Sequence, residues 1–225
     1  MNLEGNIRGL CDKFGLDYIG FLADIGVESV FELSVSDLEI ICEEYHTDLN
    51  ALLFKFPFKS NHLNDKLKKI KLLVIDVDGV MTDGGMYFAE NGDQMKKFNT
   101  KDGMAIIHLT KNDFQVAIIS SGFKGEAVER RAEMLGIQHC IVSRKPKMET
   151  LTEICVNLKI ETENVAIVGD DINDLEVMRN VGFSACPADA VNSVKSTVDV
   201  ILTNKGGEGC VREFIDLYLL KEPLA

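Results

Sequence analysis

The stretch LLVIDVDGVMTDGG, residues 72–85, decides the fold of this chain. Four apolar residues, typical of a buried strand, run directly into Asp76 and Asp78, and a glycine follows. Two carboxylates this close together repel each other unless a cation or a proton lies between them. A strand that ends in this way predicts a chemically active site at its carboxyl end.

Short apolar runs alternate with helical stretches from residue 67 onward. The runs are LLVID, VAIIS, HCIV, VAIVGD, FSA and VDVIL, and helices are expected at 103–112, 125–135, 147–158, 172–180, 188–196 and 209–220. This alternation is typical of βαβ units. We therefore predict an α/β fold over residues 66–225, a Rossmann-like doubly wound parallel sheet with helices on both faces.

One segment, residues 84–103, interrupts this alternation. It contains two short runs with apolar and aromatic residues on either side of ENGD, and Asn91-Gly92 is the strongest two-residue hairpin signal. We expect a β-hairpin that projects from the active edge of the sheet.

Residues 1–62 are predicted to form a separate, small all-α module. Apolar positions recur at helical spacing in NIRGLCDKFG, YIGFLADIG, SVFEL and SDLEIICEEYHTDLNALLF, with Ser36 as an expected N-cap. The last of these segments faintly resembles a bacterial helix-turn-helix. The proline and polar residues of FPFKSNHLNDK indicate a linker to the second domain.

The charge of the chain argues against nucleic acid as a partner. The formal net charge is −12, and residues 1–65 hold four basic and twelve acidic side chains, a net of −8. Phosphate backbones are bound by clustered Lys and Arg. The N-terminal module is therefore expected to pack or to bind protein.

The composition is that of an ordinary globular protein, with 46% hydrophobic and 27% charged residues. The apolar runs are far shorter than the roughly 20 residues that span a bilayer. The first residues lack a secretory pattern, so we expect a cytoplasmic protein without membrane contact. The six cysteines form no C-x-x-C pair and are expected to be reduced core thiols.

Polar residues of a coherent kind follow three of the predicted strands. They are Asp76 and Asp78 after the first strand, Ser120 and Ser121 after the second, and Asp170, Asp171 and Asp174 after the fourth. Ligands of open parallel sheets bind at the carboxyl ends of the strands, so these side chains are expected to share one site. Clustered carboxylates with spare water positions suit Mg²⁺.

The expected metal ligands are the side chains of Asp76 and Asp170 and the backbone carbonyl of Asp78. A metal alone leaves the hydroxyl of Ser120 and the nearby lysines unexplained. Together these groups describe phosphoryl transfer, with a carboxylate nucleophile, a second carboxyl for proton transfer and donors to the phosphate oxygens. Lys145 and Lys147 are both candidates for the phosphate contact.

The motifs resemble those of the haloacid dehalogenase superfamily of phosphatases. DVDGVMT, IIS, Lys147 and GDDINDL match its four motifs in order and spacing. The resemblance implies that Asp76 attacks phosphorus to form an aspartyl-phosphate. It implies that Asp78 protonates the leaving sugar oxygen and then deprotonates the hydrolytic water.

The same resemblance implies contacts for the phosphate and the metal. Ser120, Ser121 and Lys147 would hold the phosphate, and Asp170 would hold Mg²⁺ with support from Asp171 and Asp174. Lys147 is favoured over Lys145 because it precedes Asp170 by 23 residues, the spacing typical of the most similar subfamily.

The intervals between the motifs are too short for a cap domain. KKFNTKDGMAI, VERRAEMLGI and NKGGEGCVREFIDLYL resemble the capless subfamily that acts on 3-deoxy-D-manno-octulosonate 8-phosphate, whose relatives act on nine-carbon sialic or KDN-type 9-phosphates. This implies a role in lipopolysaccharide or sialic-acid-type biosynthesis. It also implies a homotetramer that is joined through the hairpin and in which a neighbouring chain covers each site.

Lys97, Asp102 and Arg212 fall on the corresponding segments and are expected to contact substrate, with Arg212 or Lys97 at the sugar carboxylate. Two features depart from the subfamily. The N-terminal module is additional, and ISSGFKG replaces the more usual LSGRDS. The identity of the sugar acid therefore stays open.

Two hypotheses from other classes compete with the enzyme. A receiver-type signalling domain also uses clustered acids, Mg²⁺ and a phosphorylated aspartate. Its acceptor aspartate ends the third strand, however, whereas Asp76 and Asp78 end the first predicted strand here. A non-catalytic sugar-phosphate sensor, with the N-terminal module as output, would tolerate loss of Asp78, and that residue is present.

Overall fold

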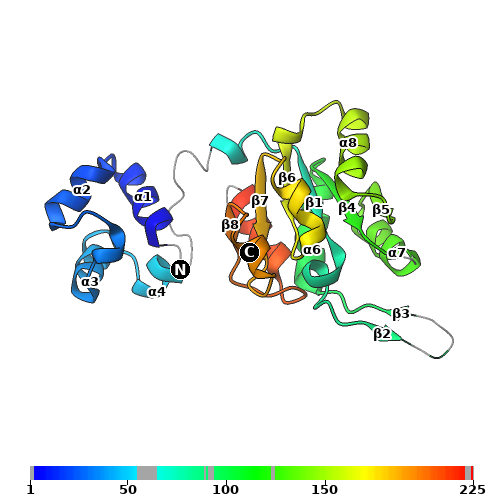
Figure 1. Ribbon diagram of the computed structural model, residues 1–225, viewed down its shortest axis with the longest axis horizontal. Helices are drawn as coiled ribbons and strands as arrows, with labels where there is room; N and C mark the ends of the chain where they lie inside the picture. Colours follow the sequence, from blue (N-terminus) through cyan, green and yellow to red (C-terminus); the bar gives the residue numbers. More distant parts are fainter. Residues whose placement is uncertain are drawn as a thin grey trace. The chain divides into compact units, whose positions relative to one another are not determined.

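The computed structural model describes residues 3–54, 65–88, 90, 94–122, 125–220 and 224. The chain divides into two compact units, Met1–Lys68 and Lys69–Ala225. Helices make up the first unit, and a parallel sheet with flanking helices makes up the second (Figure 1).

The N-terminal unit is a small helical module with a core of its own. Its elements are α1 (Leu3–Phe14), α2 (Tyr18–Ile25), the short turn η1 (Val30–Glu32), α3 (Val35–Glu44) and α4 (Leu49–Phe54). Ile7, Leu10 and Leu52 are fully buried at its centre, as the helical spacing of apolar residues predicted. The Asn6 side chain ties α1 to α4, because its Nδ2 donates to Leu52 O at 2.7 Å.

The N-cap predicted within this unit was wrong by two residues. Ser34, not Ser36, caps α3, and its hydroxyl accepts the Asp37 N–H while the Asp37 carboxylate accepts the Ser34 N–H. Because this reciprocal arrangement satisfies two backbone donors at once, the helix begins at Val35. Ser36 lies inside the helix.

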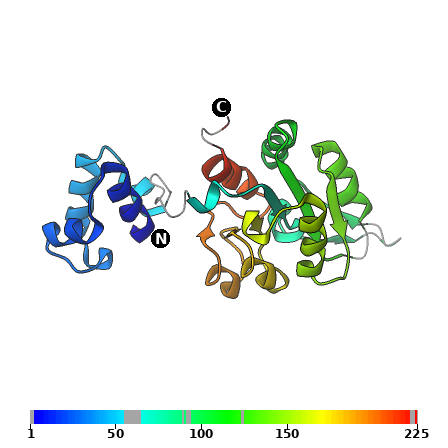
Figure 2. The same ribbon diagram turned by 90° about the horizontal axis from the view of Figure 1, so that it is seen from above.

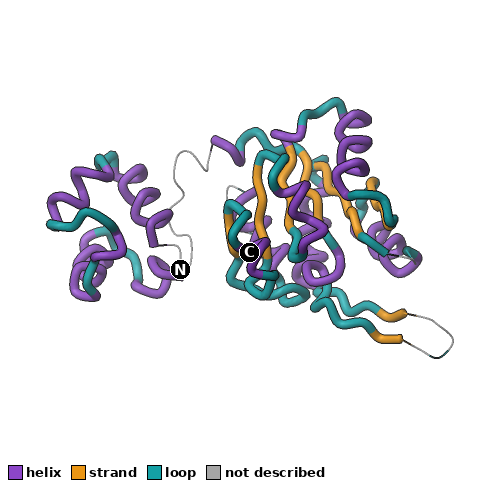
Figure 3. Tube along the Cα trace, viewed as in Figure 1, coloured by secondary structure: helices purple, strands orange, loops and turns teal. Residues whose placement is uncertain are grey.

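The second unit is built on six parallel strands, as predicted. They are β1 (Leu72–Ile75), β4 (Gln115–Ser120), β5 (His139–Val142), β6 (Val165–Val168), β7 (Phe183–Cys186) and β8 (Val200–Ile201), in the order β5-β4-β1-β6-β7-β8 (Figure 3). Ile75 pairs with Ile118 on one side and Val168 on the other. The strand order reverses at β1, so the segments that follow β1 and β6 meet at the switch point of the sheet.

Helices cover both faces of this sheet (Figure 2). They are α6 (Thr100–Lys111), α7 (Glu126–Leu135), α8 (Lys147–Leu158), α9 (Leu175–Met178), α10 (Asn192–Lys195) and α11 (Cys210–Phe214). Leu72 and Val74 of β1 pack with Leu151 of α8 and Val177 of α9 in one core cluster. None of the helices in the described ranges has the length and apolar character needed to cross a bilayer.

The later helices are more irregular than the sequence predicted. The stretch 172–180 begins as the tight turn η4 (Ile172–Asp174) before α9, and α11 widens into η5 (Ile215–Leu219). The short turn η3 (Thr162–Asn164) precedes β6. At η4 the tight turn lets the Asp174 side chain reach back to the end of β6.

The interrupting segment forms the predicted β-hairpin. β2 (Tyr87–Phe88) pairs antiparallel with β3 (Gln94–Met95), and Tyr87 lies opposite Met95. The Asn91-Gly92 turn and most of the predicted linker lie outside the described residues.

Candidate functional site

Asp76 lies at the first position after β1, where the sheet switches direction. Its backbone N–H donates to Val168 O at 3.0 Å, so β6 fixes the chain at this point. The side chain is only 7% exposed. The turn η2 (Val77–Met81) follows directly, and the Thr82 N–H closes it by donating to Val77 O. A buried carboxylate is therefore held rigidly at the position where open sheets bind ligands.

Gly79 explains why a glycine follows the two acids. Its φ is +85°, and a Cβ there would lie 2.0 Å from Asp170 Oδ2. The loop after β8 approaches equally closely, because a Cβ on Gly206 would lie 2.0 Å from Gly79 O. The GDDINDL and NKGGEG segments therefore both pack against the backbone of the DVDG turn.

Lys147 supplies the positive charge of this cluster. Its Nζ lies 2.9 Å from Asp76 Oδ1 and 2.6 Å from Asp174 Oδ1, and its side chain is 3% exposed. Lys145 instead is exposed and pairs with Glu153 at 3.3 Å. Of the two candidate lysines, Lys147 is thus the one that the structure brings to the acids.

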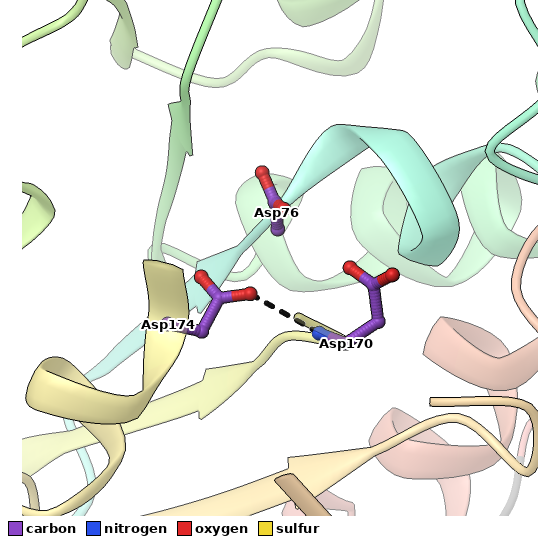
Figure 4. A group of neighbouring side chains, drawn as sticks. All are labelled: Asp76, Asp170 and Asp174. Atoms are coloured by element: carbon purple, nitrogen blue, oxygen red, sulfur yellow. Dashed lines mark hydrogen bonds between the residues drawn. The ribbon is translucent and has the colours of Figure 1, made fainter. Parts of the chain in front are cut away.

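Asp174 organises the end of β6. One of its oxygens accepts from Lys147, and the other accepts the backbone N–H of Asp170 at 3.1 Å and of Asp171 at 3.4 Å (Figure 4). Asp171 accepts the Ile172 N–H at 2.7 Å and so caps η4. Asp174 is fully buried and Asp171 is exposed, so the two supporting acids have different tasks.

Burial and mutual repulsion raise the pKa of the site carboxyls. Desolvation raises the pKa of Asp76 to about 6, although the Lys147 ammonium opposes the shift. Desolvation and the charge of Asp76 raise the pKa of Asp170 to about 7. Desolvation lowers the pKa of Lys147, but the charges of Asp76 and Asp174 outweigh it and leave that pKa raised. One lysine does not balance three acids.

The donor set fits a hard divalent cation. Oxygens of Asp76, Asp170 and Asp174 all lie within 4.8 Å of one another. Asp170 Oδ1 is buried and has no hydrogen-bond partner among the described residues. Since the Asp174 oxygens are occupied by Lys147 and by backbone N–H groups, Asp76 and Asp170 are the carboxylates best placed as ligands.

Asp78 lies beside this cluster with a side chain that is 37% exposed. Its Oδ1 forms an ion pair with Lys96 of the hairpin, and Thr82 Oγ1 lies 3.4 Å from the same oxygen. Lys96 is nearly buried, and we did not identify it from the sequence. The predicted neighbour Lys97 is 68% exposed and lies 3.3 Å from Asp83.

Ser120 and Ser121 stand at the end of β4, next to β1. Ser120 is 4% exposed, and its carbonyl accepts the Ser143 N–H. Ser121 Oγ lies 3.4 Å from Asn173 Nδ2, so η4 and the end of β4 meet across the switch point. Asn173 is a second residue that the sequence reasoning missed, although it lies within the GDDINDL motif.

Asp102 and Arg212 were both predicted to contact substrate. In this chain, a hydrogen bond between them joins α6 to α11. Asp102 is 1% exposed, and its Oδ1 accepts the Arg212 backbone N–H at 2.7 Å at the start of α11. Burial raises the pKa of Asp102 to about 6 despite backbone N–H donors from α11. The Arg212 guanidinium pairs with Asp216 at 2.5 Å and donates to Leu224 O at 2.6 Å.

The family model of haloacid dehalogenase-like hydrolases matches residues 100–182. A 3-deoxy-D-manno-octulosonate 8-phosphate phosphatase of Salmonella typhi is 40% identical over 163 residues, which are 72% of this chain and 86% of the relative.

Solved structures of such phosphatases are also similar to this chain. The 3-deoxy-D-manno-octulosonate 8-phosphate phosphatase of Yersinia pestis has a TM-score of 0.68 at 38% identity, over 71% of this chain and 85% of that one. The enzyme of Moraxella catarrhalis, in complex with magnesium, phosphate and KDO, has a TM-score of 0.67 at 34% identity, over 71% and 91%.

Proposed function

Because this chain belongs to the haloacid dehalogenase-like hydrolases and is a phosphatase, we propose that it is a Mg²⁺-dependent phosphomonoesterase for a sugar-acid phosphate. The observation that carries the proposal is the buried Asp76, which pairs with Lys147 at the switch point and lies close to an Asp170 oxygen that has no hydrogen-bond partner in the described part of the chain. 3-Deoxy-D-manno-octulosonate 8-phosphate is the first candidate substrate, because the similar phosphatases are named for it. Nine-carbon sialic or KDN-type 9-phosphates are the second.

Asp76 is the proposed nucleophile. Its carboxylate oxygen attacks phosphorus as the bond from phosphorus to the sugar oxygen breaks, which gives an aspartyl-phosphate. Lys147 favours the ionised Asp76, against the effect of burial. Its ammonium also offers a donor to the phosphate oxygens, together with the hydroxyls of Ser120 and Ser121.

Asp78 is the proposed general acid and base. It gives its proton to the leaving sugar oxygen, and the resulting carboxylate then takes a proton from the water that attacks the aspartyl-phosphate. This second step releases inorganic phosphate and restores both carboxyl groups. Lys96 and Thr82 restrict the orientation of the Asp78 carboxylate, because both bond to its Oδ1.

Asp76 and Asp170, with the backbone carbonyl of Asp78, are the groups that would hold Mg²⁺. When bound, the ion supplies positive charge that offsets the repulsion between the carboxylates and the phosphate. Asp174 and Lys147 orient these ligands, because they bond to the Asp170 N–H and to Asp76 Oδ1.

The experiment that tests the function is phosphate release from a panel of sugar phosphates with Mg²⁺. The panel holds the eight-carbon and nine-carbon sugar-acid phosphates, their neutral hexose phosphate counterparts and a small aryl phosphate. We expect the highest kcat/KM with a sugar-acid phosphate and loss of activity with excess EDTA. Turnover limited to neutral sugars would contradict the proposed substrate class.

A further inference from the structure

The N-terminal unit carries a groove for which the phosphatase mechanism has no use. It has a volume of about 560 Å³ and lies between α2 and α3. Phe21, Ile25, Ile40 and Tyr45 are among the residues that line it. Ile40 is 60% exposed, whereas its neighbour Ile41 is 3% exposed and belongs to the core of the unit. The groove therefore presents apolar surface that this unit does not bury.

Carboxylates surround this apolar floor. Asp17, Asp24, Asp37 and Glu44 all line the groove. Asp17 also accepts the Gly20 N–H at 2.7 Å, and Asp37 accepts the Ser34 N–H at 2.8 Å, so both are held in place. Asp24 and Glu44 are exposed. The rim is thus acidic on both helices.

The described residues that line the groove include no Lys or Arg. Arg8 and Lys13, the Lys and Arg residues of the range 3–54, are absent from the groove lining. Arg8 pairs with Glu4 at 2.9 Å and lies over the Tyr18 ring at 3.8 Å. An incoming cationic group would therefore meet carboxylates first.

The spacing of the lining residues fits a helical occupant. On α3 the groove is lined at positions 37, 40, 41 and 44, and on α2 at 20, 21, 24 and 25. Each set is one face of a helix, so both helices offer an apolar stripe edged by acids. An amphipathic helix can lay its apolar face into such a groove.

The net charge of the chain indicates which kind of amphipathic helix the groove would bind. Residues 1–65 carry a net charge of −8 and the whole chain −12. A second copy would bring an equally acidic groove, and like charges at an interface oppose association. We propose that the groove between α2 and α3 binds a basic amphipathic helix of another protein. Its apolar face covers Ile40 and Phe21, and its Lys or Arg side chains pair with Asp24 and Glu44.

The test uses the full-length protein and two fluorescent peptides of about 18 residues, or five helical turns. Both peptides have the same leucine face, and the polar face is lysine in one and glutamate in the other. Fluorescence anisotropy should show binding of the lysine peptide that weakens with salt, and no binding of the glutamate peptide. Equal binding of both peptides would overturn the proposal.

Matched variants test whether the lysine peptide binds in the groove. Glu44→Lys and Ile40→Gln change the groove, whereas Glu39→Lys and Ile19→Gln make the same changes at exposed positions outside its lining. Each groove variant should bind the lysine peptide about tenfold more weakly, and each control should stay within about twofold of wild type.

Phosphate release by all four variants should match wild type, because the acid cluster lies in the other unit. Controls that lose as much affinity as the groove variants would overturn the proposal. Self-association of the wild-type chain that Ile40→Gln disrupts would also overturn it, because the occupant would then be a second copy.

Discussion

Lys147 Nζ lies 2.9 Å from Asp76 Oδ1, with both side chains buried at the switch point of the sheet. The same ammonium is 2.6 Å from Asp174 Oδ1. One cation thus joins the end of β1 to η4, two segments almost a hundred residues apart. The ion pair keeps Asp76 charged in surroundings that would otherwise favour its protonation.

Replacing Lys147 with Met should therefore destabilise the metal-free protein by about 3–5 kcal/mol at neutral pH, because it leaves buried carboxylates uncompensated. Thermal unfolding measures this loss, and phosphate release should fall as well. Lys145→Met is the matched control, since its exposed pair with Glu153 should contribute less than about 1 kcal/mol. Equal stability of the two variants would contradict the role of the buried pair.

The affinity for Mg²⁺ should depend on pH. The pKa of Asp170 is raised to about 7 and that of Asp76 to about 6, so both carboxyls bind protons in the metal-free site at mildly acidic pH. Since a metal ligand must be deprotonated, affinity should be close to its full value at pH 8 and fall as pH drops through 7 and then 6. Isothermal titration calorimetry should also detect protons released on binding near pH 6.5. The same dissociation constant at pH 5.5 and pH 8 would argue against these ligands.

Asp102→Asn separates a structural role from substrate contact. The pKa of Asp102 is raised to about 6 in the folded protein, above its ordinary value. The folded state then binds more protons than the unfolded state between about pH 4 and pH 6, so ionisation lowers the stability as pH rises through this window. The variant should lack this loss. Its free energy of unfolding, relative to that of wild type, should therefore be higher at pH 7 than at pH 4.5.

Unfolding curves of wild type and Asp102→Asn at these two pH values give the comparison. If Asp102 acts through α11, KM for the sugar-acid phosphate should change little. A large rise in KM without a change in pH-dependent stability would support the substrate contact that the sequence predicted.

The sequence predicted the sheet and the strand-end acids, because apolar runs and their polar ends are local features of the chain. It did not predict which lysine of the hairpin faces the site. Lys96 and Lys97 are adjacent, and alternate residues of an extended chain point to opposite sides. Only the placement of the hairpin against the DVDG turn decides that Lys96 meets Asp78.

The contact between Asp102 and the start of α11 could not be predicted from the sequence either. It joins residues 110 positions apart, and an acid near a helix start gives no sign of a distant partner. The cap at Ser34 could not be chosen from the sequence either, because Ser34 with Asp37 and Ser36 with Glu39 have the same spacing of reciprocal caps. The two short extended runs of the hairpin, in contrast, were evident from local sequence alone.

The hairpin should join several chains, most simply into the tetramer predicted from the sequence. Met86, Tyr87 and Met95 are 54%, 56% and 70% exposed on a two-stranded element that is marginal in water. Tyr87→Ser with Met95→Ser should lower the mass measured by light scattering and weaken sugar-acid turnover. Val156→Ser, an exposed position on α8, should leave both unchanged. A wild-type monomer with efficient turnover would rule out this assembly.

Covalent attack by Asp76 is the central claim, and an acid quench during turnover tests it most directly. Peptide mass spectrometry of the quenched enzyme should find one phosphoryl group on Asp76, and sodium borohydride should reduce that acyl phosphate to homoserine. Asp76→Asn should carry no phosphoryl group and release no phosphate above background. A phosphoryl group on another residue, or near-normal turnover by Asp76→Asn, would contradict the account.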